Sequence, residues 1–310
     1  MKNFNIDFFG KKKTFFTISL VLIAVGLICN IFFGTKLDVQ FAGGAFIKYS
    51  VDGEVQQEEV EAIVEETLGR ECSVATNTII GTGEDQVTVT FAGNESITLE
   101  NQEAIAEVLS AKFADRTFKV VESSSVDASM GAKFFQKCIV CFIITVIFLL
   151  IYITLRFKKI GGLAAGVTAI VALVHDVLIV YFVFIICRMN INDIFIAVIL
   201  TIIGYSLNDT IVIFDRIREN ERLHKKDGLE AIINMSLNQT MTRSIITSAT
   251  TFAVLLVVYI VALVYGLTTV TSFALPMMVG VVAGCYSSLV IAAPLFGMWQ
   301  LKQAEKKANA

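Results

Sequence analysis

Charged residues and proline are scarce in this chain, in which 17% of the 310 residues are charged and only two are proline. Soluble domains carry about 25% charged residues. Hydrophobic residues, by contrast, make up 55% of the sequence. This shortage of charge together with the excess of apolar residues predicts a polytopic membrane protein rather than a soluble domain.

Disulfide bonds are excluded by the positions of the cysteines. Five of the six cysteines fall in or beside long apolar stretches, and only Cys72 lies in the segment expected outside the membrane. A single cysteine cannot form an internal bridge. Cys138 and Cys141 have a spacing that metal ligands use, but no second pair accompanies them, so we expect no metal site.

Several functional classes are disfavoured because their motifs are missing. The segment expected outside the membrane has no catalytic triad, metal cluster or phosphate-binding loop, so we expect neither an enzyme nor a bound cofactor. Asp176 and Asp209 lie on adjacent apolar stretches, but the Gly-x-Gly-Asp motif of intramembrane aspartyl proteases is absent. The basic cluster in 216–243 is short and close to the membrane. It indicates topology and contact with anionic membrane lipid, and no nucleic-acid partner.

Six apolar stretches are long enough to cross a hydrocarbon core of ~30 Å, which takes about 20 helical residues. They are Thr14–Phe33, Cys138–Leu155, Gly161–Cys187, Ile194–Phe214, Ile245–Tyr265 and Val270–Gly297. The first follows three lysines, as a signal peptide would, but it is too long for one and no small-residue cleavage site follows it. We expect it to remain as an anchor.

Lysine and arginine gather on one side of the membrane if the chain crosses it six times. They cluster near the N-terminus, at 156–159, between 216 and 243, and in the tail. The positive-inside rule then places both termini in the cytoplasm. We expect four parts: the N-terminus and first span (1–34), an exported domain (35–132), a five-helix membrane region (133–300) and a cytoplasmic tail (301–310). Eighteen acidic residues fall in the exported part.

The exported segment is predicted to fold as a compact α+β domain. Alternating patterns indicate strands, amphipathic patterns indicate helices, and glycine-rich turns separate them. The strands are expected at Phe46–Val51, Cys72–Ile80, Gln86–Phe91 and from Phe118, and the helices at Val55–Leu68 and Asn101–Phe113. The order β-α-β-β-α-β is the ferredoxin-like arrangement, which hosts many functions and therefore indicates no particular role.

Asp209 lies inside the fourth apolar stretch, about 8–9 Å from its charged end at 1.5 Å per residue. A carboxylate near the middle of a membrane costs at least ~2.5–3.5 kcal/mol on insertion scales, so we interpret Asp209 as a functional acid. Arg243 opens the fifth stretch, and Thr247, Thr250 and Thr251 follow it on one helical face. Protonation of the acid would free the base, which is the logic of a proton relay.

Structural roles are open at each of these positions. Asp209 and Arg243 could form a static pair that fixes the helix register, and Arg243 could instead extend to the membrane interface. Asp176 could pair with His175 only to satisfy a polar cluster. For Asp176 the structural and functional interpretations are equally supported.

Small residues and proline predict local packing. The motifs Gly162-x-x-x-Gly166 and Gly280-x-x-x-Gly284 would let helices approach closely. Both prolines lie in the sixth stretch, where they would kink the helix or loosen its hydrogen bonding. The segment Asp215–Arg243 is too short for a domain and predicts one or two surface helices around Gly228.

These motifs resemble those of the SecD/SecF family of bacterial export proteins, on its SecF side, within the resistance-nodulation-division superfamily. The most specific segment contains Gly204, Asn208, Asp209, Asp215, Arg216 and Arg218. The segments Gln239–Ser248 and Val174–Val177 are also similar. The family's usual Asp-Phe-x-Gly-Gly-Thr motif reads Gln40-Phe41-Ala42-Gly43-Gly44-Ala45 here, which keeps both glycines but loses the acid and the hydroxyl.

The resemblance implies an accessory subunit of the Sec preprotein translocase in the bacterial cell membrane. Such a subunit promotes the late, outer-side stage of protein export with the proton- or sodium-motive force. Asp209 and Arg243 would belong to the ion-coupling site, with Asp176 and Thr247 as weaker candidates. The implied partners are a SecD-like subunit, the SecYEG channel and the translocating preprotein. A small-molecule exporter of the same superfamily is the alternative, although such exporters usually fuse two six-span halves.

Overall fold

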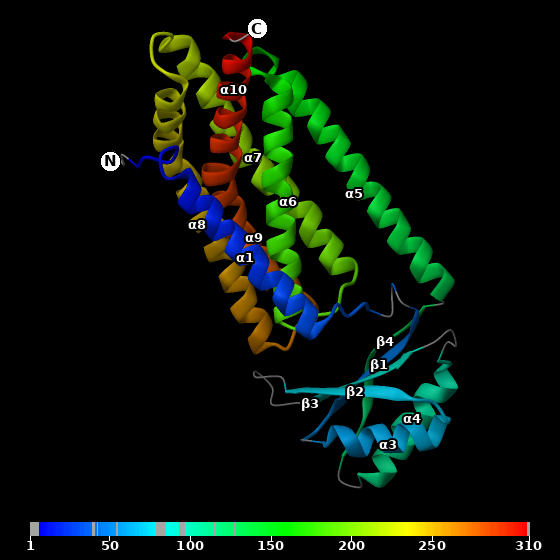
Figure 1. The fold of residues 1–310 in the computed structure, drawn as a ribbon. Coiled ribbons are helices and arrows are strands. Elements are labelled where there is room, and N and C mark those ends of the chain that lie inside the picture. Colours follow the sequence, from blue (N-terminus) through cyan, green and yellow to red (C-terminus); the bar gives the residue numbers. More distant parts are fainter. Residues whose placement is uncertain are drawn as a thin grey trace.

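A computed structural model describes residues 6–38, 41, 43–53, 55–78, 85–92, 97–113, 116–126 and 128–308. The chain forms a bundle of long helices with a small α+β domain at one end (Figure 1). The start of α1 and the end of α10 lie toward the other end of the bundle, away from this domain (Figure 1).

Within the described ranges, six helices are long and apolar enough to cross a membrane, which confirms the predicted number of spans. The first five are α1 (Lys12–Phe33), α5 (Ala128–Arg156), α6 (Gly162–Ile186), α7 (Asp193–Leu223) and α8 (Leu229–Val264). A short 3-10 turn, η1 (Lys158–Ile160), separates α5 from α6. The sixth span joins α9 (Thr268–Ser287), the π-helix η2 (Ser288–Ala292) and α10 (Ala293–Ala308).

The helices α7 and α8 extend well beyond their apolar stretches. No separate surface helix forms in the described segment between them, because α7 continues to Leu223 and α8 already begins at Leu229. The first turns of α8 bury apolar residues at helical spacing, among them Ile233 and Leu237, against the main core. This amphipathic face makes the segment part of the bundle, which corrects the expectation of surface helices.

The α+β domain has the predicted ferredoxin-like order. Its strands are β1 (Gly44–Val51), β2 (Cys72–Thr78), β3 (Asp85–Ala92) and β4 (Lys119–Val126), and its helices are α3 (Gln57–Leu68) and α4 (Leu99–Lys112). The sheet is antiparallel, with the strand order β2-β3-β1-β4. Both helices lie on the side of the sheet that faces away from the bundle (Figure 1).

Close helix contacts occur at both small-residue motifs. A Cβ atom on Gly162 would overlap the backbone carbonyl oxygen of Thr154 at the end of α5, and one on Gly280 would overlap the side chain of Ile202. Gly284 faces Ser206, where an added Cβ would lie 2.9 Å from the serine Cβ. The missing side chains therefore let α6 and α9 approach their neighbours closely.

The sixth span changes its winding just before Pro294. Proline has no backbone N–H, so the carbonyl four residues earlier loses its usual helical donor. The π-helix η2 covers residues 288–292, immediately upstream of this position, and all five of its residues are buried. A single wide turn of this kind is a common way to accommodate an irregularity within a long helix, and such turns are frequent at functional sites.

Candidate functional site

Asp209 is half-buried on α7 and faces α8. Its Oδ1 accepts a hydrogen bond of 2.7 Å from the hydroxyl of Ser244. Its Oδ2 is buried and has no hydrogen-bond partner among the described residues. A buried carboxylate oxygen without a donor is costly to keep ionised. The site therefore has one satisfied oxygen and one that is open to a proton.

Arg243 lies one residue before Ser244 on α8, and its side chain is exposed. It lies within electrostatic range of Asp209, but the two form no ion pair within the part of the chain that the structure describes. Neighbouring residues on a helix point about 100° apart, so the side chain that meets Asp209 is the Ser244 hydroxyl. The neutralising pair considered from the sequence is not formed in this conformation.

The threonine stripe of α8 lies on the exposed side of this helix. Thr247 is exposed, and the hydroxyl of Thr250 donates to its own helix at the carbonyls of Ile246 (3.0 Å) and Thr247 (2.9 Å). Thr251 donates in the same way to the Thr247 carbonyl at 3.0 Å. Hydroxyls satisfied by their own helix can face an apolar environment at little cost.

A second polar contact joins α7 to α8 one turn deeper in the membrane. Tyr205 donates to the Ser248 hydroxyl at 3.1 Å. The sequence did not single out Ser244 or Ser248 as partners of α7, although both belong to the motif segment that ends at Ser248. Their i, i+4 spacing on the buried face of α8 is the signal that would have identified them.

The charged end of α7 forms a network around a pocket of about 1230 Å³. Asp215 pairs with Arg156 of α5 at 3.1 Å and with Arg218 at 2.7 Å. Arg216 contacts Glu219 and donates to Gln239 of α8, each at 2.6 Å. The structure thus brings the predicted motif residues Asp215, Arg216 and Arg218 together, and Arg243 lines the same pocket.

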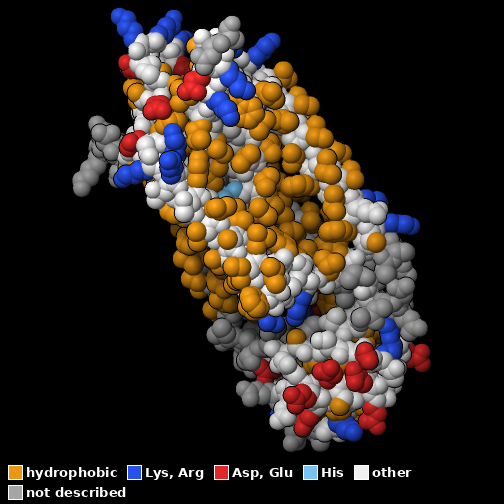
Figure 2. Space-filling view, viewed as in Figure 1, with side chains coloured by type: hydrophobic (Ala, Val, Ile, Leu, Met, Phe, Trp, Pro, Cys, Tyr) orange, Lys and Arg blue, Asp and Glu red, His pale blue; other side chains and the backbone are white. Residues whose placement is uncertain are grey.

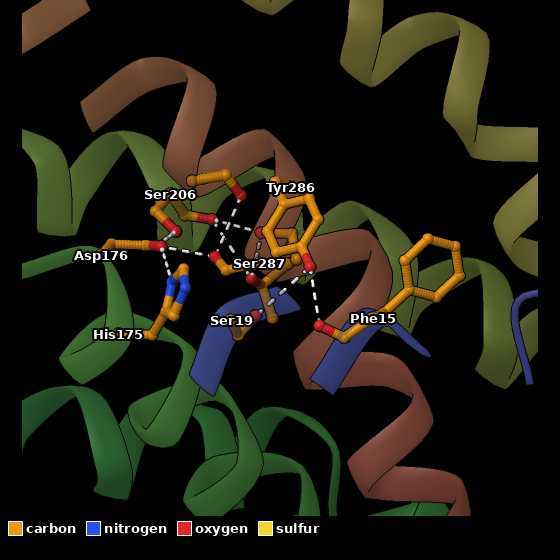
Figure 3. A network of polar contacts seen from close by, with 10 residues as sticks. Phe15, Ser19, His175, Asp176, Ser206, Tyr286 and Ser287 are labelled. Carbon is orange, nitrogen blue, oxygen red and sulfur yellow. Dashed lines mark hydrogen bonds and ion pairs between the residues drawn. The ribbon is translucent and has the colours of Figure 1, made fainter. Parts of the chain in front are cut away.

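Asp176 is fully buried on α6 in a separate polar network (Figure 3). Its Oδ2 accepts hydrogen bonds from Ser206 of α7 (2.6 Å) and Ser287 of α9 (2.8 Å). Its Oδ1 lies 3.1 Å from Nδ1 of His175. The Nε2 of His175 is buried without a partner among the described residues. Three helices therefore meet at this one carboxyl group.

Further hydroxyl groups extend this network across the bundle. Thr210 and Ser288 share a hydrogen bond of 2.8 Å, and Tyr286 donates to the Phe15 carbonyl of α1 at 2.9 Å. Ser19 donates to the Tyr286 hydroxyl at 3.3 Å (Figure 3). Thr210 bonds η2 whereas Asp209 bonds α8, so these two consecutive residues of α7, about 100° apart on the helix, serve the two networks on different sides.

The remaining motif residues lie outside both networks. Gly204 and Asn208 are exposed on α7, and a Cβ on Gly204 would meet nothing within 4 Å. Gly43 and Gly44 have φ angles of 82° and 140°, in the region that favours glycine. Gln40 and Ala42 lie outside the described residues. Within the described ranges, no group of three His, Cys, Asp or Glu residues could hold a metal ion.

Comparison with known proteins identifies the family. Residues 105–302 match the family described as protein export membrane protein SecD/SecF, C-terminal. The chain belongs to the SecD/SecF family. Over 309 residues it is 34% identical to the protein translocase subunit SecF of Petrotoga mobilis, and the match covers 98% of this chain and 99% of that protein.

Longer members of the SecD/SecF family match only in part. The chain is 33% identical to the protein translocase subunit SecDF of Bacillus subtilis, covering 97% of this chain but 39% of that protein. The crystal structure of SecDF from Thermus, described as a translocon-associated membrane protein, is 26% identical, with a TM-score of 0.80. That match covers 96% of this chain and 39% of the SecDF chain. The shared fold includes both the helical bundle and the α+β domain.

Proposed function

We propose that this protein is an accessory subunit of the Sec preprotein translocase that uses an ion gradient to promote the late, outer-side stage of export. Family membership supports the Sec-pathway role, because the curated relatives are protein translocase subunits. The observation that carries the ion-driven part is Asp209, a carboxyl group within a membrane-spanning helix whose Oδ2 has no partner among the described residues.

The proposed orientation places both termini in the cytoplasm of a bacterial cell and the α+β domain outside. Lysine and arginine side chains gather at the end of the bundle opposite this domain, together with a few acidic ones, whereas several acidic side chains lie on the domain itself beside a few basic ones (Figure 2). Cationic residues favour the cytoplasmic side of a membrane. The α+β domain would then stand where an emerging polypeptide leaves the channel.

The chemistry of Asp209 suits a site that alternates between charged and neutral forms. When it is ionised, the hydroxyl of Ser244 stabilises Oδ1 and the nearby charge of Arg243 offsets part of the desolvation cost. When a proton binds at Oδ2, Arg243 loses this attraction and its side chain is free to stay in the pocket. A change of charge between α7 and α8 would alter how these two helices pack.

A SecD-like subunit is the proposed partner in the membrane. The SecDF relatives are much longer than this protein, which matches 39% of the Bacillus subtilis relative. The rest of that relative would correspond to the SecD-like partner. The exposed side of α7 and α8, with Gly204, Asn208 and Thr247, would face this partner. SecYEG and the translocating preprotein are the proposed partners outside this pair.

The proposal is tested by Asp209→Asn, which is nearly isosteric but cannot ionise. Export of a model precursor is measured in vesicles that contain the SecD-like partner, with and without a proton or sodium gradient. We expect normal assembly and loss of the stimulation by the gradient. A variant that assembled normally and kept the full stimulation would show that Asp209 is only structural. Asp209→Glu, which keeps the ionisable group, is the matched control.

A further inference from the structure

The pocket between the ends of α5, α7 and α8 is rich in basic side chains, which the proposed ion coupling does not require. It is lined by basic side chains from the ends of α5 and α7, from the turn η1 and from α8. We propose that it binds the phosphodiester headgroup of an anionic phospholipid. This inference goes beyond the proposed function, and it gives a particular site to the membrane lipid expected from the sequence.

The two acids in the pocket do not neutralise all of its basic residues. Asp215 is already used by Arg156 and Arg218, and Glu219 is used by Arg216. Four more cations line the pocket and have no ion pair within the described ranges: Lys158, Lys159, Arg222 and Arg243. Several unpaired cations around one cavity attract a multivalent anion.

The arginine pairs also arrange the pocket for phosphate. Asp215 holds Arg156 of α5 and Arg218 of α7 on one carboxylate, so it fixes the two walls of the pocket relative to each other. Arginine presents a planar fork of N–H donors that matches a phosphate group, and its remaining donors are free for a ligand. The pocket thus combines arginines held by Asp215 with lysines that have no ion pair within the described ranges.

The position of the pocket favours a lipid over a free anion. Its apolar wall includes Val212 of α7 and Leu155 of α5. Leu155 is 69% exposed. Below Leu155, the exposed side chains of Ile151 and Phe148 continue along α5 toward the middle of the span. Basic groups therefore lie at the depth where the apolar part of the span ends, with an apolar surface directly below them. An anionic phospholipid has the matching arrangement, with a charged headgroup at the membrane surface and apolar acyl chains below it.

The volume of about 1230 Å³ is also larger than one inorganic phosphate requires. Pockets for drug-sized ligands span about 300–1,000 Å³. A glycerophosphate headgroup with the upper part of its acyl chains is of this size. The competing occupant is an acidic segment of the partner subunit, and the experiment below distinguishes the two.

The test is lipid binding to the purified full-length protein in a neutral detergent, measured by native mass spectrometry. The lipids are dioleoylphosphatidylglycerol and dioleoylphosphatidylcholine, and inorganic phosphate is added as a competitor. We expect one saturable site for phosphatidylglycerol, at least tenfold weaker binding of phosphatidylcholine, and no competition by millimolar phosphate. The triple variant Lys158→Gln, Lys159→Gln, Arg222→Gln should weaken phosphatidylglycerol binding at least tenfold.

Two control variants separate this site from general charge and from folding. Lys302→Gln, Lys306→Gln, Lys307→Gln removes the same charge from the tail and should leave binding unchanged. Lys158→Arg, Lys159→Arg, Arg222→Lys keeps the charge of the pocket and should retain binding. If the neutral triple variant does not fold, the single variant Lys158→Gln replaces it, with an expected reduction of about threefold.

Three results would overturn the proposal. Equal loss of binding in the tail variant would mean that only net charge matters. Displacement of the lipid by millimolar inorganic phosphate would identify a site for a free anion. Complete loss of the bound lipid when the SecD-like partner is present would assign the pocket to the subunit interface.

Discussion

Asn238 on α8 exchanges two hydrogen bonds with the backbone of Ile6, 232 residues earlier in the chain. The Ile6 amide donates to Asn238 Oδ1 at 2.9 Å, and Asn238 Nδ2 donates to the Ile6 carbonyl at 2.8 Å. One turn earlier, Asn234 accepts from the Phe9 amide at 2.9 Å and donates to Asp7 at 2.8 Å. The segment before the first span is therefore docked on the extension of α8.

The double variant Asn234→Ala, Asn238→Ala should release this N-terminal segment. Each lost bond to a buried or half-buried partner costs on the order of 1 kcal/mol, and Phe9 would lose its buried position. We expect a lower melting temperature in detergent and faster trypsin cleavage at Lys11–Lys13. The exposed residue Glu230, on the same helix, provides the control Glu230→Ala. Unchanged cleavage in the double variant would contradict the docking.

The pKa of Asp7 adds a pH dependence to this docking. Hydrogen bonds from the Gly10 amide and from Asn234 lower the pKa of Asp7 below its usual 3.8. A carboxyl whose pKa is lower in the folded state stabilises that state above its unfolded pKa, and the contribution is lost as the pH falls through the folded value. Hydrogen exchange of the segment, which needs no protease that must work in acid, should therefore show the segment docked at neutral pH. The docking should weaken only in strong acid.

Ser244→Ala should impair ion coupling without abolishing it. The variant removes the one hydrogen bond that Asp209 receives in the described part of the chain, and bonds to charged groups contribute about 1.5–3 kcal/mol. We expect a several-fold reduction in gradient-stimulated export. Ser244→Thr keeps a hydroxyl at the same position and should restore most of the activity. Equal defects in both variants would indicate that packing, and not the hydrogen bond, is what matters.

Two glycines should respond in opposite ways to the same change. In Gly162→Ala the new methyl group would overlap the Thr154 carbonyl oxygen, and overpacking of this kind costs about 1–3 kcal/mol. Gly204→Ala meets no atom within 4 Å and should stabilise α7 by roughly 0.5–1 kcal/mol. Melting temperatures of the isolated subunit measure both. If Gly204→Ala also destabilised the subunit, the exposed position of Gly204 would be wrong.

Cys72 should react slowly with thiol reagents. Burial, followed by the charges of Glu65 and Glu61, raises the pKa of its thiol to about 11. Only the thiolate reacts, so at pH 8 labelling by a maleimide should be on the order of a hundredfold slower than for an ordinary exposed thiol. The rate should keep rising up to about pH 11. Peptide mass spectrometry of Cys72 gives the rate, and urea-unfolded protein is the reference.

The proposed topology is tested with cysteines introduced at two exposed residues. Glu103 lies on α4 of the α+β domain, and Lys225 lies in the turn between α7 and α8. A reagent that cannot cross the membrane should label Glu103→Cys in intact cells and should label Lys225→Cys only after permeabilisation. The reverse pattern would invert the orientation.

The spans and the two intramembrane acids were predictable because the free energies of placing apolar or charged groups in a membrane are large. Twenty apolar residues or a buried carboxylate leave few alternatives in a membrane, so the six spans were correctly predicted. The β-α-β-β-α-β order of the α+β domain was also correctly predicted, from its alternating and amphipathic patterns. Asp176 and Asp209 were recognised for the same reason, although the roles proposed for them are still predictions.

The partners of these acids were less predictable because they depend on helix rotation. Arg243 is the obvious partner of Asp209 by charge, yet the neighbouring Ser244 makes the contact. Ser206 and Ser287 bind Asp176, but a serine costs little in a membrane helix and gives no sign of its direction. Sequence periodicity assigns a face only to within the width of one residue, which is too coarse to choose between Arg243 and Ser244.

The π-helix at 288–292 has a geometric consequence for the whole sixth span. One wide turn holds an extra residue, so the two halves of the span are out of phase by about 100°. Ser287 and Ser288 lie at this junction and reach different partners, Asp176 and Thr210. A deletion of one residue in this turn would restore regular winding but swing Phe296 and Gly297 away from the core they now occupy. The extra residue thus acts as an angular offset that lets a single helix fit two differently oriented surfaces.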